Sequence, residues 1–145
     1  MSGIVAELSF RIPGAPQGKG RARSSGPYHY TPAKTRAYEA MVRSVFRLAH
    51  PRHVTIPAHN PVTLTIIAES VRPPSVKRVA PTVTPDWDNI GKTVSDALNG
   101  LAWHDDAQVT DARVIKRYAV TAGVEVLVEW GSDLTCEAQE GTPAA

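Results

Sequence analysis

Hydrophobic residues recur along the chain with two different periods, and each period predicts an element. Apolar side chains occupy every second position over residues 4–12, which is the period of a β-strand. Residues 61–71 are rich in β-branched side chains, and residues 124–130 (VEVLVEW) alternate cleanly. Residues 108–120 make a fourth predicted strand. We expect the last two strands to form a hairpin around residues 121–123.

Two other segments follow the helical period. In residues 31–49 the apolar positions are Tyr38, Met41, Val42, Val45, Phe46 and Ala49. Thr31 is the expected N-cap of this helix, with Pro32 in its first turn. A second helix is predicted over residues 88–99, with Asp88 as N-cap and Asn99-Gly100 as the stop signal. The order β, α, β, α, β, β predicts an α/β (α+β) fold: a small mixed sheet of about four strands with two main helices packed on it.

Loops and a tail separate these elements. The segment PGAPQGKGRARSSGP (residues 13–27) and the segment RPPSVKRVAPTVTP (residues 72–85) combine proline with basic side chains. We expect the second of these loops to be mobile. Residues 132–145 are small, polar and acidic, and we expect a disordered tail there. This leaves residues 1–131 as one domain.

Composition excludes several classes of protein. Hydrophobic residues make up 42% and charged residues 21% of the 145 positions, as in an ordinary globular domain. No apolar run approaches the roughly 20 residues of a membrane helix. Cys136 is the one cysteine, so a disulfide framework or a cysteine-based zinc site is not available. The start of the sequence has no basic leader before a long apolar run, so we expect a cytoplasmic location.

The charge is divided unevenly along the chain. Residues 1–85 hold 12 Lys and Arg against three Asp and Glu, a net charge of +9. Residues 86–145 hold four against eleven, a net charge of −7. A basic half favours a polyanionic partner such as nucleic acid, although a solvated surface is the plainer interpretation.

Aspartates gather just where the basic half ends. Asp86 and Asp88 are two positions apart in a segment that Pro85 biases toward extended backbone, so their side chains can point the same way. If the chain turns back after residue 99, Asp105 and Asp106 approach this first pair. Converging carboxylates repel one another unless a cation neutralises them. Hard oxygen ligands suit Mg²⁺, and metal-assisted hydrolysis of a phosphodiester is the chemistry that this pattern favours.

A plainer reading of the same residues remains open. Aspartate is a favoured cap and turn residue, so both pairs can be purely structural. Lys92 lies one helical turn after Asp88 and either pairs with a neighbouring carboxylate or contacts a phosphate beside the metal. Asp96, one turn further on, is the expected partner of Lys92. Trp87, between two of the aspartates, either packs or stacks on a base.

The segment PDWDNIGKTVSDALNGLAWHDDAQV resembles the signature of the RusA-type Holliday-junction resolvases, roughly D-x-D-N-x-x-K, then D-A-L, a short turn and D-D-x-Q-V. The looser motifs IPGAPQGKGRAR and YTPAKTRAYEAMV resemble the phosphate-contacting loop and the first helix of the same family. The resemblance spans about residues 4–130. The acidic tail has no counterpart in it.

The resemblance implies a catalytic site and a way of working. It assigns Asp86, Asp88 and Asp106 as the Mg²⁺-binding catalytic carboxylates, with Mn²⁺ as a substitute, and Lys92 as the catalytic lysine. Asp105 is a further metal-ligand candidate. It also implies a homodimer that cuts branched double-stranded DNA by paired symmetrical nicks in recombination and repair, in phages, prophages or their bacterial hosts, without a small-molecule cofactor or a membrane.

The basic half supplies the expected DNA contacts, which come from its two loops and its helix: Lys19, Arg21, Arg23, Lys34, Arg36, Arg43, Arg72, Lys77 and Arg78. Two alternatives to a junction resolvase stay open. One is a less selective Mg²⁺-dependent nuclease that acts on flaps, forks or duplex. The other is a DNA-binding module without catalysis.

Overall fold

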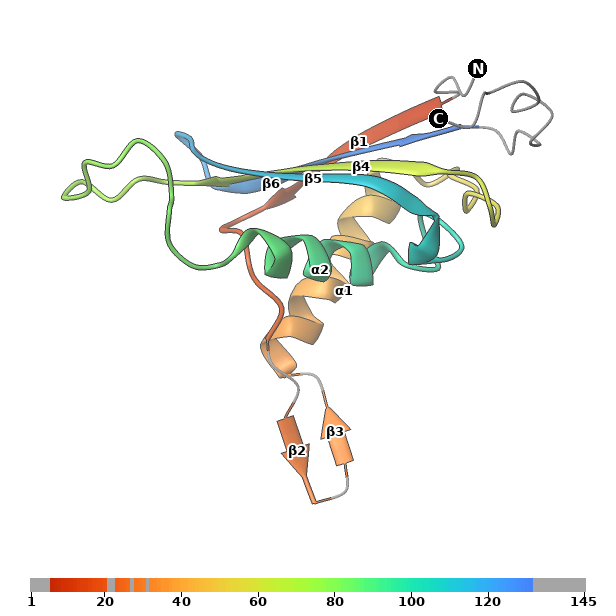
Figure 1. The fold of residues 1–145 in the computed structure, drawn as a ribbon, viewed down its shortest axis with the longest axis horizontal. Coiled ribbons are helices and arrows are strands. Elements are labelled where there is room, and N and C mark those ends of the chain that lie inside the picture. The colour runs from red at the N-terminus through yellow and green to blue at the C-terminus, as the bar shows by residue number, and fades with distance from the viewer. Residues whose placement is uncertain (1–5, 21–22, 27, 31, 132–145) are drawn as a thin grey trace, which may run out of the picture.

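Figure 1 shows a four-stranded sheet with two α-helices on one side of it. The computed structural model describes residues 6–20, 23–26, 28–30 and 32–131, with the backbone alone for residues 23–25 and 28–30. The predicted fold class, a small mixed sheet carrying two helices, is confirmed. The predicted tail, residues 132–145, lies outside the described residues.

The sheet has the strand order β1-β6-β4-β5. β6 (Gly123–Trp130) runs antiparallel to both of its neighbours, β1 (Ala6–Pro13) and β4 (Val62–Ser70). β5 (Val109–Tyr118) lies at the edge and pairs with β4 in parallel. One parallel pair among antiparallel ones makes the sheet mixed, as the order of predicted elements implied.

The predicted hairpin between the last two strands is wrong. β5 pairs with β4, and β6 lies on the opposite side of β4, so the chain crosses the end of β4 between them. The Ala119 N–H donates to the Ser70 carbonyl at this crossing, at 2.9 Å. The strand patterns give the reason. β6 has an apolar face that is fully buried in the centre of the sheet, whereas much of β5 is exposed, as suits an edge.

Both helices pack on the same face of the sheet. α1 (Ala33–Ala49) contacts β1, α2 (Trp87–Leu98) contacts β5, and the two helices contact each other. Gly91 lies where α2 meets β5: a Cβ atom there would be 3.2 Å from Val114 Cγ2. The glycine costs helix stability, roughly 1 kcal/mol against alanine, but it lets the helix lie close to the edge strand.

The core lies between the helices and the sheet. Its largest side chains include Trp103, which is fully buried, and Trp130 is half-buried and packs against the core. The buried stripe of each helix follows the predicted period. The stripe of α1 includes Tyr38, Val42 and Phe46, and that of α2 includes Ile90, Val94 and Leu98.

Two predicted loops contain more structure than expected. Residues 23–30 form a small antiparallel ribbon, β2 (Arg23–Ser25) with β3 (Tyr28–Tyr30), which projects away from the sheet in Figure 1. No alternation of apolar residues marks such short strands, so the pattern gave no signal for them. The predicted cap Thr31 lies outside the described residues.

The loop after β4, expected to be mobile, is anchored to β5 at two points. Arg78 Nε donates to the Tyr118 hydroxyl at 3.0 Å, and Lys116 Nζ donates to the Val83 carbonyl at 2.5 Å. Among the described residues, none of the helices is long and apolar enough to span a membrane.

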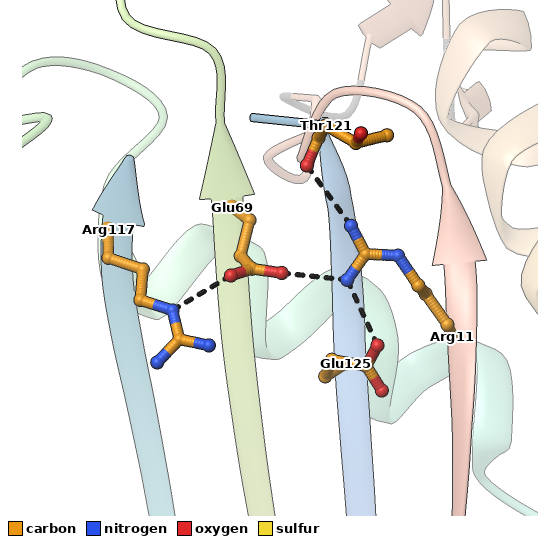
Figure 2. Close-up of polar contacts among 5 residues, drawn as sticks. All are labelled: Arg11, Glu69, Arg117, Thr121 and Glu125. Atoms are coloured by element: carbon orange, nitrogen blue, oxygen red, sulfur yellow. Dashed lines mark hydrogen bonds and ion pairs between the residues drawn. The ribbon is translucent and has the colours of Figure 1, made fainter. Parts of the chain in front are cut away.

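The sheet face away from the helices carries a row of charges that crosses all four strands (Figure 2). Arg11 on β1 contacts Glu125 at 2.9 Å and Glu69 at 2.7 Å, and Arg117 on β5 contacts Glu69 at 2.8 Å. Hydrogen bonds from Arg11 and then Arg117 hold the pKa of Glu69 below its usual value. Gly123 leaves room for this row, since a Cβ atom there would lie 2.5 Å from the Arg11 guanidinium. This row of charges therefore links all four strands at the end of the sheet where the chain crosses from β5 to β6.

Candidate metal and DNA site

The first two aspartates lie at the start of α2. The predicted N-cap, Asp88, is wrong: the helix begins at Trp87, so that Asp86, in extended backbone, is the N-cap residue and Asp88 lies in the first turn. The Asp86 side chain makes no capping hydrogen bond, although its carbonyl accepts from the Ile90 N–H at 3.0 Å. Both carboxylates are exposed. The extended backbone predicted for this segment is confirmed at Asp86 but not at Asp88, which is helical, and the Asp86 side chain is not used as a cap.

The chain turns back sharply after α2. Gly100 has a φ of +78°, a conformation that glycine adopts without strain. The return segment is then held against the loop before β4: the Ile56 N–H donates to the Ala102 carbonyl at 3.0 Å and the His104 N–H donates to the Ile56 carbonyl at 3.1 Å. The turn therefore folds over, as the metal-site hypothesis required, rather than extending away.

Asp106 is the partly buried carboxylate of this turn. The buried indole of Trp103 donates from Nε1 to Asp106 Oδ1 at 2.7 Å, and the Asp106 N–H donates to Asn99 Oδ1 at 3.2 Å. Burial raises the pKa of Asp106 above its usual value, against the lowering effect of the Trp103 hydrogen bond; the nearby charges of Asp96 and Asp105 raise it further, and that of Lys92 lowers it. A nearby cation would relieve the cost of its charge.

Asp105 caps the short helix that follows it. Its side chain accepts from the Ala107 N–H at 3.0 Å, and its own N–H donates to the Gln108 side chain at 2.8 Å, which makes a capping box on the short 3₁₀ helix Asp106–Gln108. It lines a separate hollow with His59 and His104. Asp105 therefore fits the structural reading of the pair, while Asp106 does not need to cap anything.

Asp88 and Asp106 line one and the same hollow, which lies between α2 and β5 and has a volume of about 240 Å³. We call it the α2–β5 hollow; Trp87, Gly91, Leu64 and Val114 line it too. Asp86 is outside its lining. Within the described ranges, no three His, Cys, Asp or Glu side chains are grouped so as to hold a metal ion. Two of the three predicted carboxylates thus line the same hollow, which extends along α2 from Asp88 to Ser95.

Lys92 is exposed on α2 and weakly paired. Its Nζ lies 3.8 Å from Asp96 Oδ2, whereas Lys19 Nζ lies 2.9 Å from the same oxygen. The predicted pair of Lys92 with Asp96 exists, but Lys19 is the closer partner of Asp96. The Lys92 ammonium therefore remains available beside the carboxylates.

Lys19 differs from its expected role as a DNA contact. Its ammonium is held between Glu39 of α1, at 2.6 Å, and Asp96 of α2. Its backbone N–H donates to the Asn89 carbonyl at 3.2 Å, and the neighbouring Gly18 lies so near that a Cβ atom there would be 3.1 Å from Pro85 Cβ. Lys19 fastens the glycine-rich loop to both helices. Sequence reasoning missed this because Glu39 and Asp96 are distant in the chain.

The other predicted DNA contacts fall into three groups. Lys34, Arg36, Arg72 and Lys77 are exposed, and Arg43 is half-exposed. Arg78 is exposed but bonded to Tyr118. Arg21, and the side chain of Arg23, lie outside what the structure describes. Lys34 also lines a groove of about 690 Å³ between the glycine-rich loop, the start of α1 and Thr84-Pro85.

Comparison with known proteins decides the family. The profile of the family "Endodeoxyribonuclease RusA" matches residues 13–129, which is most of the chain. The chain belongs to the RusA endodeoxyribonuclease family. The uncharacterized protein YqaN of Bacillus subtilis (strain 168) is 32% identical over 134 residues, covering 83% of this chain and 94% of that protein. The resemblance inferred from the sequence motifs is thereby confirmed.

The donor set of this RusA-family chain suits a hard divalent cation. All candidate ligands are carboxylates, which Mg²⁺ and Mn²⁺ accept. Asp86 and Asp88 make no side-chain hydrogen bond within the described part of the chain, and Asp106 is a partly buried carboxylate whose raised pKa reflects the cost of its charge. Trp103 and Asn99 support Asp106 by hydrogen bonds that depend on the folded turn, so the sequence alone gives no signal for this role.

Proposed function

We propose that this RusA-family protein is a Mg²⁺-dependent endodeoxyribonuclease that nicks four-way DNA junctions. One observation supports it above the rest: Asp88, in the first turn of α2, and Asp106, in the turn that follows α2, line a single hollow. If the aspartates served only as caps and turn residues, Asp106 would not need a hydrogen bond from the buried Trp103 that holds it at a position where burial raises its pKa.

In this proposal the residues of the site have separate roles in metal binding, positioning and phosphate contact. Asp86, Asp88 and Asp106 would hold the cation, which when bound supplies positive charge and an acidified water for attack on phosphorus. Trp103 fixes the Asp106 carboxylate by its hydrogen bond. Lys92, exposed beside them, orients a phosphate oxygen and stabilises the charge that develops on it.

The DNA backbone reaches this site along the groove that ends at Thr84-Pro85, directly before Asp86. Lys34 lines the groove, and Arg36 follows on α1. Such contacts position the DNA without reading its sequence. The groove thus leads phosphates toward the carboxylates, which explains why the acidic residues follow a basic half.

The active form is a homodimer in this proposal. A four-way junction presents two equivalent strands related by a two-fold axis, so two copies of the site related by the same symmetry make paired nicks. A single copy of the site would make one nick and leave the junction unresolved.

The test compares substrates. The protein is incubated with an immobile four-way junction and with a linear duplex of equal length, each with Mg²⁺, Mn²⁺ or EDTA. We expect symmetrical nicks in the junction with either metal and none with EDTA. Equal cutting of both substrates would indicate the less selective nuclease instead, and binding without any cutting would indicate a DNA-binding module.

A further inference from the structure

Trp87 is the one tryptophan of the chain that stands in solvent. Its side chain is 65% exposed, while Trp103 is fully buried and Trp130 half-buried. Among the described residues it has no aromatic partner and no side-chain hydrogen bond. Burial of an indole is strongly favourable, so packing within the domain does not explain its position.

The surroundings of Trp87 are unusual for an exposed aromatic residue. It stands between Asp86 and Asp88 in sequence and lines the α2–β5 hollow together with Asp88 and Asp106. Most of the remaining lining is apolar and comes from the sheet: Leu64, Ile66, Val109, Ala112 and Val114. Gly91 and Ser95 of α2 and Arg113 of β5 complete it. The hollow is thus a largely apolar recess whose lining also carries two carboxylates, one guanidinium and the indole.

The chemistry of this recess selects one part of a DNA substrate. With two carboxylates against the single guanidinium of Arg113, the lining has a net negative charge that repels a phosphate unless a metal cation is bound, and a sugar has little apolar surface to offer. A base is planar, uncharged and suited to an indole face. Bases offer a free face only where the duplex stack is interrupted, as at a branch point.

We propose that Trp87 is the stacking platform for an unstacked DNA base next to the scissile phosphate, and that it makes the protein prefer branched DNA over duplex. This inference rests on the proposed nuclease function, because the carboxylates beside Trp87 are its metal ligands. Trp87 then discriminates between DNA structures rather than between base sequences, since every base has a face to stack.

The experiment measures binding in EDTA, so that no cleavage takes place. The DNA probes are a four-way junction with 2-aminopurine at the branch point and a linear duplex with the same label. The variants are Trp87→Phe, Trp87→Leu and Trp87→Ala, with Val120→Ala as the control because Val120 is 97% exposed and remote from α2 in sequence. Circular dichroism and sedimentation of each variant report folding and oligomeric state.

We expect Trp87→Ala and Trp87→Leu to weaken junction binding about fivefold to a hundredfold, the range for loss of one stacked base, while duplex binding stays unchanged. Trp87→Phe should retain most of the affinity, and 2-aminopurine should be quenched by the wild type only on the junction. Val120→Ala should behave as wild type.

Three results would overturn the inference: equal junction affinity in all variants, equal losses on junction and duplex, or a change of oligomeric state in Trp87→Ala, which would place the indole in a contact between copies. Failure of the nuclease proposal is seen separately, as absence of junction cleavage by the wild type in Mg²⁺. The binding comparison in EDTA gives its answer in either case.

Discussion

Asp105 and Asp106 are adjacent and chemically identical, yet the structure gives them opposite surroundings. Asp105 satisfies the backbone of its own turn, whereas Asp106 accepts a hydrogen bond from Trp103 and lines the α2–β5 hollow. Spacing alone could not separate them, because both fall in the same short segment. The distinction follows from which side chain has its oxygens committed to the backbone.

The raised pKa of Asp106 makes a prediction about stability. Because the folded protein holds this proton more tightly than the unfolded chain, the charged carboxylate destabilises the fold at pH values above its raised pKa. We expect Asp106→Asn, which can still accept from Trp103, to melt at an equal or higher temperature than the wild type at pH 7 in EDTA. The difference should shrink as the pH falls through about 4 and vanish well below it, where the Asp106 carboxyl is neutral in both the folded and the unfolded chain.

Adding Mg²⁺ reverses this order at pH 7. The cation binds the folded wild type and should raise its melting temperature, whereas Asp106→Asn should respond little. Thermal melts with and without Mg²⁺ measure both effects. A variant that melts well below the wild type in EDTA would show that the carboxylate stabilises the fold, contrary to this account.

At the scale of elements, α2 and the glycine-rich loop are joined by Lys19. Its two carboxylate partners come from different helices, and their side chains are mostly buried. This arrangement leaves Lys92 free for a phosphate. Lys19 was predicted as a DNA contact because it is a basic residue in a glycine-rich loop, and its two carboxylate partners became visible only in the packing of α1 against α2.

Lys19→Met should therefore lower stability rather than alter the electrostatics of DNA binding. We expect a loss of about 1–3 kcal/mol in the free energy of unfolding, because two carboxylates lose their partner. The salt dependence of junction binding should keep its slope. The matched variant Lys34→Met, at the exposed start of α1, should instead reduce that slope by about one while leaving stability almost unchanged. The reverse pattern would make Lys19 the phosphate contact.

At the scale of the molecule, the row of charges in Figure 2 joins all four strands of the sheet. Since Glu69 has a lowered pKa, its contribution is present at pH values above its ordinary range near 4 and is lost as the pH falls toward the lowered value. Glu69→Gln should thus melt below the wild type at pH 7, with the gap closing as the pH is lowered through this range. Glu129→Gln, on β6, is the control; an equal gap at every pH would indicate a loss of packing instead.

Periodicity predicted every long element of the fold, because burial of one face imposes the period on the sequence. It did not predict which strands pair. β5 and β6 are consecutive and separated by a glycine-containing turn, and the sequence offered no sign that Gly123 makes room for Arg11 instead of closing a hairpin. Strand order depends on which strand is buried between two others, and the packing of the whole sheet determines this.

The candidate site was predictable in its residue types and only partly in its geometry. The chain turns back at the predicted stop signal Asn99-Gly100, which is a local feature, and Asp88 and Asp106 then line the same hollow. The roles of Trp103, Asn99 and Lys19 depend on contacts made after folding. Asp86, although in the predicted extended backbone, lies beside the hollow rather than in its lining.

The most direct test of the central claim, that Asp88 and Asp106 share one cation, is the single-turnover rate of junction cleavage in Mg²⁺. The variants are Asp88→Asn and Asp106→Asn, with Asp105→Asn and the exposed Asp111→Asn as matched controls. We predict a loss of about a hundredfold or more for the first two, with junction binding retained in EDTA, and near wild-type rates for the controls. Cleavage that survives Asp106→Asn but is lost in Asp105→Asn would contradict the account.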